Sequence, residues 1–243
     1  VLESLARRLL AAKNPMILAG TELVGGNAGF NEAARLAEIL GCPVYQQTVP
    51  HGAHFPSEHP AFMGALSRNQ AEVREILSSY DLLISLGAEL LTMSVYSPVD
   101  PLPPATKVVQ IGLRDWEMGK NWAADFAVRS DIKETLECLN PVLEKIGGVE
   151  RAAEAQASLA KYANRNWSAQ RLPKRESARK KAEQSPIAPD WLMMCLADRL
   201  PEDVILVDEG LTTSASLLSF FPFRDRYSYF GNVSGGIGWG IAA

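Results

Sequence analysis

Cysteine, histidine and excess basic charge are all scarce in this sequence. Only three cysteines and three histidines occur in 243 residues. Cys42, Cys138 and Cys195 lie far apart, with no Cys-x-x-Cys pair and no histidine cluster beside them, which predicts neither a disulfide framework nor a zinc site. The formal net charge of −4 argues against nucleic acid as a partner, because a phosphate backbone is held by an excess of lysine and arginine.

Long apolar runs are absent too. No run approaches the length needed to cross a bilayer and no signal peptide opens the chain, so we expect no membrane partner and a parent protein that works in the cytoplasm. With 47% hydrophobic and 21% charged residues, the chain has enough apolar material to bury a full core. Its length suits one large domain or two small ones.

The first 146 residues alternate short apolar runs with amphipathic segments. The apolar runs predict strands at 15–20, 43–48, 81–87, 107–113 and 126–128. Asp131 and Glu134 have the spacing of a capping box, which predicts a helix towards Ile146 with a break or kink at Pro141. Because the predicted strands are apolar throughout and separated by helices, we expect an α/β fold with a Rossmann-like parallel sheet and helices on both faces.

The composition changes after this region. A polar, alanine-rich segment leads into the run 171–183, in which six residues are basic and two are acidic. No aromatic residue interleaves these charges as a nucleic-acid stacking platform requires, so we interpret the run as a solvated linker. We therefore divide the chain into a Rossmann-like domain at 1–146, a helical and basic linker at 147–186, and an incomplete second α/β domain at 187–243.

The last stretch contains the most informative pattern. The apolar run Val204–Asp208 precedes Thr212, Thr213 and Ser214, and the chain then continues as a helix, a strand and a glycine loop. A strand that ends in hydroxyl residues at a helix N-terminus can hold phosphate, because free N–H groups, the helix dipole and the hydroxyls point the same way. Read separately, the hydroxyl run is ordinary capping and the glycine run a tight turn. Together they indicate a cofactor site.

These two blocks resemble the thiamine diphosphate-dependent 2-oxo acid decarboxylases and synthases, most closely the benzoylformate decarboxylases. In that family an Asp/Asn-Glu-x-x-Ser/Thr-Ser/Thr segment precedes a Gly-Gly-hydrophobic-Gly-aromatic loop, as 208–213 and 235–239 do here. The resemblance implies that the diphosphate is held by Thr212 and the backbone of Leu211, with Thr213 beside them. It also implies a role in cofactor binding for the glycine loop.

Within that loop, the resemblance implies that the Gly235 carbonyl meets the aminopyrimidine, with Gly236 next to it, and that Ile237 separates the two rings of the cofactor. Two carboxylates, Asp208 and Glu209, precede this site and would repel a diphosphate unless they turn away or hold a cation. We interpret Glu209 as a group that orders the loop rather than as a proton relay. No catalytic residue and no metal ligand is assigned.

The intact parent is implied to use thiamine diphosphate and magnesium. In the family, the metal-binding segment follows the last helix begun here, and the glutamate that protonates the aminopyrimidine belongs to an N-terminal domain. We therefore expect a truncated fragment that binds neither cofactor nor metal and is inactive by itself. The implied substrate is a small-molecule 2-oxo acid. The family forms dimers and tetramers, so we expect a homo-oligomer.

The first part of the chain resembles the family's middle domain, a six-stranded Rossmann-like sheet, at 14–15, 41–44, 55–64 and 87–88. In some relatives this domain binds FAD or ADP, so a nucleotide-binding module is an alternative function. The glycines near the first strand do not form the Gly-x-Gly-x-x-Gly turn that such binding uses. A non-catalytic partner of an intact relative is the other alternative.

Histidines are candidates for acid–base chemistry because imidazole titrates near neutrality. His51, His54 and His59 lie in one proline-bearing loop, and we expect them in solvent or at subunit contacts rather than as metal ligands. The benzoylformate decarboxylases carry an acid–base histidine in a later loop, where this sequence has Ser94. Serine cannot shuttle a proton near neutral pH. The resemblance therefore implies the cofactor class without identifying the 2-oxo acid.

Overall fold

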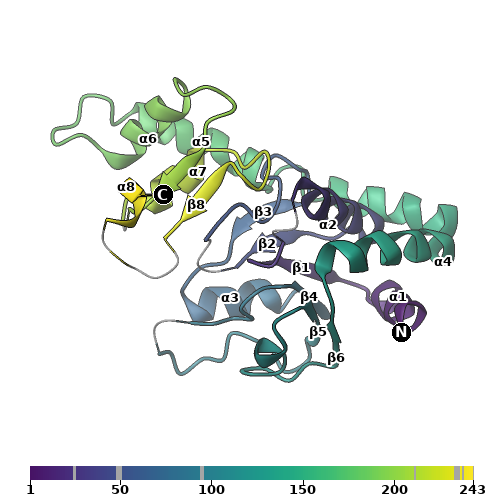
Figure 1. The fold of residues 1–243 in the computed structure, drawn as a ribbon. Helices are drawn as coiled ribbons and strands as arrows, with labels where there is room; N and C mark the ends of the chain where they lie inside the picture. Colours follow the sequence, from purple (N-terminus) through teal and green to yellow (C-terminus); the bar gives the residue numbers. More distant parts are fainter. Residues whose placement is uncertain are drawn as a thin grey trace.

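A six-stranded sheet, parallel throughout, forms the larger part of the molecule (Figure 1). The computed structural model describes residues 1–23, 26–47, 51–93, 96–210, 212–232, 236 and 238–242. The strands follow the order β3-β2-β1-β4-β5-β6. They are β1 (Pro15–Ala19), β2 (Val44–Gln46), β3 (Phe62–Ala65), β4 (Leu82–Leu86), β5 (Lys107–Gly112) and β6 (Phe126–Arg129).

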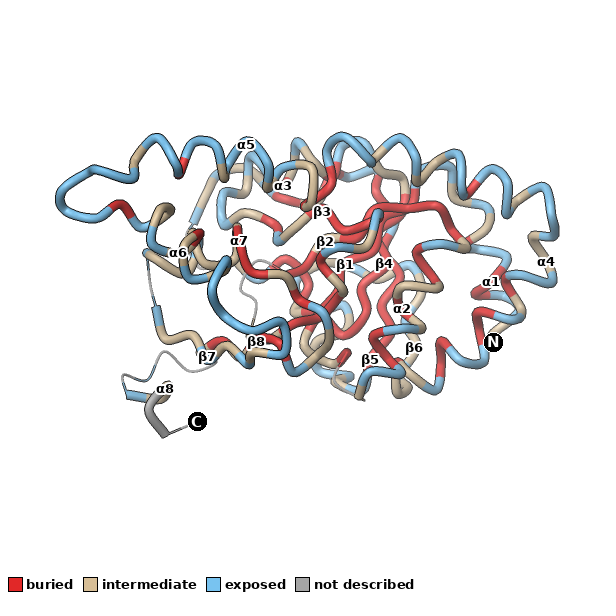
Figure 2. Tube along the Cα trace, turned by 90° about the horizontal axis from the view of Figure 1, so that it is seen from above, coloured by how far each residue is buried: buried red, intermediate tan, exposed pale blue. Residues whose placement is uncertain are grey.

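Helices cover both faces of this sheet, which confirms the predicted α/β fold. They are α1 (Leu2–Ala11), α2 (Asn27–Leu40), α3 (Gln70–Leu77) and α4 (Ile132–Ala160), and a short 3-10 turn η1 (Asp115–Glu117) follows β5. Alternate residues of β1 enter opposite cores: Ile17 packs in the cluster that holds α1, α2 and α4, and Met16 in the cluster that holds α3. Both faces of the strand are therefore apolar, and the buried residues concentrate along the central strands (Figure 2).

This domain differs from the prediction at two places, a strand that was not predicted and a helix break that lies elsewhere. The strand β3 was not predicted, because Phe62–Ala65 is short and contains Gly64, which adopts a positive φ of 103°. The predicted capping contact is confirmed, since the Asp131 carboxylate accepts from the Glu134 N–H at 3.0 Å. The break in α4, however, falls at Gly148, with φ 65° and ψ −168°, and not at Pro141. Glycine adopts that conformation readily. A proline inside a helix removes one backbone hydrogen bond, and the packing of buried neighbouring residues offsets that loss.

The basic run forms ion pairs on both sides of helix α5 (Trp167–Arg179). Arg171 contacts Glu58 of the first part at 2.9 Å, whereas Arg175 contacts Asp198 of the last part at 2.5 Å. Trp167 is buried in the main core and donates its indole N–H to the Leu218 carbonyl. Most residues of the run 171–183 are exposed, as expected for a solvated linker, while Arg171 and Arg175 tie α5 to both parts of the chain.

The C-terminal part forms a smaller unit beside the β3 edge of the sheet (Figure 1). It consists of α6 (Pro189–Ala197), β7 (Leu206–Asp208), α7 (Ser214–Phe220), β8 (Tyr229–Gly231) and α8 (Trp239–Ala242), with β7 and β8 paired in parallel. Phe223 and Tyr229 pack against Phe30 of α2 and so join this unit to the first domain. Among the described residues, no helix is long and apolar enough to cross a bilayer.

Candidate functional site

The Asp208 carboxylate organises the turn that follows β7. Its Oδ1 atom accepts from the Gly210 N–H at 2.7 Å and from the Ser214 hydroxyl at 3.0 Å. Its Oδ2 atom accepts from the Tyr229 hydroxyl of β8 at 2.9 Å. Burial and the neighbouring Asp208 raise the pKa of Tyr229, so this phenol remains a donor at neutral pH. The carboxylate is thereby directed into the protein.

Glu209 points to the other side of the strand, towards the first turn of α8. Its carboxylate accepts from the backbone N–H groups of Gly240, at 2.9 Å, and Gly238. These two hydrogen bonds lower the pKa of Glu209, since they favour the charged form. Both acidic side chains of the motif are therefore held by donors of the chain itself: Asp208 by the turn that follows β7 and by β8, and Glu209 by the start of α8.

The predicted diphosphate residues lie at the exposed start of α7. Thr213 caps the helix without a side-chain hydrogen bond to its backbone, and Thr212 is exposed beside it. Gly236 accepts from the Asn232 side chain at 3.0 Å, which links β8 to the glycine loop. Three further predicted residues lie outside the described part of the chain: Leu211, Gly235 and Ile237. The cofactor roles of all these residues remain predictions.

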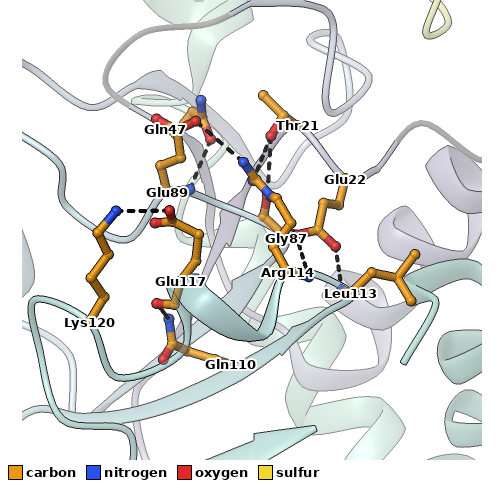
Figure 3. Close-up of polar contacts among 10 residues, drawn as sticks. All are labelled: Thr21, Glu22, Gln47, Gly87, Glu89, Gln110, Leu113, Arg114, Glu117 and Lys120. Atoms are coloured by element: carbon orange, nitrogen blue, oxygen red, sulfur yellow. Dashed lines mark hydrogen bonds and ion pairs between the residues drawn. The ribbon is translucent and has the colours of Figure 1, made fainter. Parts of the chain in front are cut away.

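At the switch point between β1 and β4, where nucleotides bind in doubly wound folds, the chain places its own ion pair (Figure 3). The Arg114 Nε atom lies 2.8 Å from the Glu22 carboxylate, which also accepts from the Leu113 N–H. The same guanidinium donates to the Thr21 hydroxyl at 2.9 Å and to the Gly87 carbonyl at 3.1 Å. These contacts engage the Arg114 guanidinium with acceptors of the chain itself.

The histidine loop follows β2 and reaches the C-terminal part. The prediction that its histidines face solvent is wrong for His54, which is 2% exposed. The loop folds inwards because the Ala53 N–H donates to the Tyr229 carbonyl and Gly52 bridges Phe230 of β8. Burial lowers the pKa of His54 to about 3, with a smaller effect from His51, so its imidazole is neutral at pH 7. His59 contacts Glu38 at 3.3 Å.

Sequence reasoning missed several residues that shape this region. Tyr229 and Arg114 belong to no recognisable motif. Their positions depend on the pairing of β7 with β8 and on the packing of loops that are distant in the sequence. Ser94, which stands at the position of the family's histidine, lies outside the described residues. In the parts that the structure describes, no group of three or more His, Cys, Asp or Glu side chains is arranged to hold a metal ion.

Comparison with known proteins agrees with this fold. The family model for the thiamine pyrophosphate enzyme, central domain, matches residues 2–139, which is more than half of the chain. The structure of a putative thiamin diphosphate-dependent enzyme from Mycobacterium smegmatis superposes with a TM-score of 0.78 at 25% identity, covering 99% of this chain and 42% of that one. Benzoylformate decarboxylase from Polynucleobacter necessarius shares the fold, with a TM-score of 0.77, 19% identity, and coverage of 98% of this chain and 41% of that one.

The chain belongs to the thiamine pyrophosphate enzymes, whose central domain it contains. Among curated relatives, it is 27% identical to benzoylformate decarboxylase from Pseudomonas aeruginosa, over 100% of this chain and 42% of the relative. It is also 26% identical to sulfoacetaldehyde acetyltransferase from Castellaniella defragrans, over 97% of this chain and 41% of the relative. The chain thus spans about two fifths of the length of these relatives.

Proposed function

We propose that this chain supplies the diphosphate-binding side of a thiamine diphosphate cleft, in a protein that decarboxylates a small 2-oxo acid. The observation that carries the proposal is the orientation of the two acidic side chains. Asp208 holds Gly210 and Ser214, and Glu209 holds the start of α8, which leaves the hydroxyls of Thr212 and Thr213 for a diphosphate. The family membership supports the cofactor class.

The donors of this turn fit the proposed cofactor. Thr212 and Thr213 offer hydroxyl and backbone donors, and hydrogen bonds of the chain hold both neighbouring carboxylates in place, so a cation is left to offset the charge of the diphosphate. When bound, thiamine diphosphate supplies a carbon nucleophile and an electron sink for the electrons released as carbon dioxide leaves. In our proposal the chain orients the diphosphate through the turn 210–214, and Glu209 fixes the glycine loop by holding the start of α8.

The proposal also covers the metal, the oligomeric state and the activity of the 243 residues by themselves. We propose that magnesium accompanies the cofactor in the complete protein, that the protein forms a homo-oligomer in the cytoplasm, and that the 243 residues alone bind no cofactor and have no activity. We propose the lack of binding and activity because the chain covers only about two fifths of the length of its relatives. We do not favour a nucleotide-binding module, because the Arg114 guanidinium at the switch point is already paired with Glu22 and the Gly87 carbonyl.

A direct assay tests this function. The complete product of the gene that encodes these residues is supplied with thiamine diphosphate and magnesium, and carbon dioxide release is followed with benzoylformate and with pyruvate. We expect release from at least one of the two acids, and none from the isolated 243-residue polypeptide. A complete product that binds the cofactor but releases no carbon dioxide from either acid contradicts the decarboxylase assignment. Turnover by the polypeptide alone contradicts its predicted inactivity.

A further inference from the structure

A cleft of about 280 Å³ lies between the carboxyl ends of the central strands and the C-terminal part, and the proposed cofactor turn does not use it. One wall comes from the sheet side, and the other comes from the loop before β8 and from β8 itself. The polar side chains that line it are Thr21, His51, His54, Glu89, Arg114, Arg226 and Tyr229. Both parts of the chain therefore contribute to one site.

Three residues that line this cleft also carry buried nitrogen atoms without a partner. Within the described parts of the chain, six buried side-chain polar atoms have no hydrogen-bond partner, and three of them belong to residues that line this cleft: His51 Nδ1, His54 Nδ1 and Arg226 Nε. A buried polar group without a partner costs free energy, and a ligand or a water that reached these atoms would recover that cost. His54 is the clearest case because it is almost fully buried.

The charges around the cleft balance in number, since Glu22 and Glu89 offset Arg114 and Arg226, but both carboxylates lie against Arg114. The guanidinium of Arg114 already contacts Glu22 at 2.8 Å and Glu89 at 3.4 Å. Arg226 has no ion pair with any described residue and only stacks on Tyr227, with 4.9 Å between its Cζ atom and the ring centroid. The Arg226 guanidinium is thus the charged group of this cleft that has no direct ion pair among the described residues. A planar carboxylate matches its fork of N–H donors.

We propose that this cleft binds a small monocarboxylic acid, whose carboxylate pairs with Arg226 and whose remaining oxygen and carbon atoms lie against His51, His54 and Tyr229. A phosphate dianion fits less well, because Glu89 lines the same cleft and would repel its second charge. A nucleotide fits less well for the same reason, since its phosphates would add further negative charge beside Glu89. The proposal does not depend on the cofactor or the reaction proposed above.

Binding here would act on both parts of the chain. The acid would bridge Arg226 of the C-terminal part and the histidine loop of the first domain. It would also lie beside Tyr229, whose hydroxyl holds Asp208 and, through it, the turn at 210–214. The cleft is therefore placed to act as an effector site that stabilises the contact between the two parts.

Calorimetry with a matched pair of variants tests the proposal. Benzoate, pyruvate and inorganic phosphate are titrated separately, without thiamine diphosphate, into the full chain and into its Arg226→Gln and Arg68→Gln variants. Arg68 is an exposed arginine that does not line the cleft, so its replacement changes the net charge by the same amount. We expect one equivalent of a monocarboxylate to bind, with at least about a tenfold loss of affinity in Arg226→Gln and none in Arg68→Gln.

A second measurement covers the case in which Arg226→Gln does not fold. The ¹⁵N resonances of the His54 ring are recorded in the unmodified chain with and without the bound carboxylate. We expect them to shift, since a ligand oxygen would fix the tautomer. Four results would overturn the proposal: no binding, tighter binding of phosphate, equal losses in the two variants, or a His54 ring that does not respond. The first and last would mean that water alone completes these nitrogen atoms.

Discussion

The hydroxyl of Tyr229 donates a 2.9 Å hydrogen bond to the Asp208 carboxylate, so a side-chain contact reinforces the pairing of β7 with β8. Tyr229→Phe removes this donor and should lower the free energy of unfolding by about 0.5–1.5 kcal/mol. Urea denaturation measures the change. Tyr227→Phe is the matched control, because Tyr227 is 47% exposed and should change stability little. Equal losses in the two variants would contradict this role of Tyr229.

Stability should fall in acid partly because of His54. Burial lowers the pKa of His54 to about 3 in the folded chain, below the usual value of 6.5. The unfolded chain therefore binds the proton first, so the stabilising effect is complete above pH 6.5 and declines as the pH falls towards 3. The slope from one such group approaches about 1.4 kcal/mol per pH unit. Urea midpoints between pH 7 and 4 should depend less steeply on pH in His54→Gln; an unchanged slope would refute the prediction.

The two positive-φ glycines near α4 should respond differently to alanine. Gly148 has φ 65° and no atom within 4 Å of an added Cβ, so Gly148→Ala should cost only backbone strain, about 1–3 kcal/mol. Gly41 has φ 64°, and its added Cβ would lie 2.5 Å from the Ala155 Cα atom, so Gly41→Ala should cost clearly more. Thermal melts of the two variants check the order. A larger loss at Gly148 would be inconsistent with this geometry.

The Glu22 and Arg114 pair should be energetically coupled. The two side chains are 15% and 23% exposed and share several backbone partners, so a double-mutant cycle with Glu22→Gln and Arg114→Met should give a coupling of about 1–2 kcal/mol. The exposed pair Glu3 and Arg7 has a similar contact distance of 2.7 Å and should show much weaker coupling. Similar coupling in the two pairs would show that the switch-point contact is no stronger than a surface pair.

The sheet was predictable because its strands carry their own signal. In β1, Met16 and Ile17 point to opposite faces of the sheet and both are apolar. A strand that is apolar on both faces indicates a position between two helical layers. The strand β3 has no such signal, since only Phe62 and Met63 precede a glycine. The break at Gly148 could not be located either, because a proline seven residues earlier was the stronger local signal.

The candidate site was predictable only where it is local in sequence. Asp208 and Glu209 lie in one short motif, and their resemblance to a family located them. The contact of Arg114 with Glu22 joins residues 92 positions apart, and the burial of His54 depends on β8, far along the chain. Such contacts depend on how loops pack at the edge of the sheet, which no periodicity in one sequence reports.

Calorimetric titration of thiamine diphosphate tests the central claim most directly. It uses the complete product of the gene that encodes these residues, with and without magnesium. The unmodified protein should bind the cofactor with a magnesium requirement. Thr212→Val should bind at least about tenfold more weakly, and Ser219→Ala, at the other end of α7, should bind as the unmodified protein does. A protein that binds no cofactor, or a Thr212→Val variant with undiminished affinity, would contradict the claim that this turn holds the diphosphate.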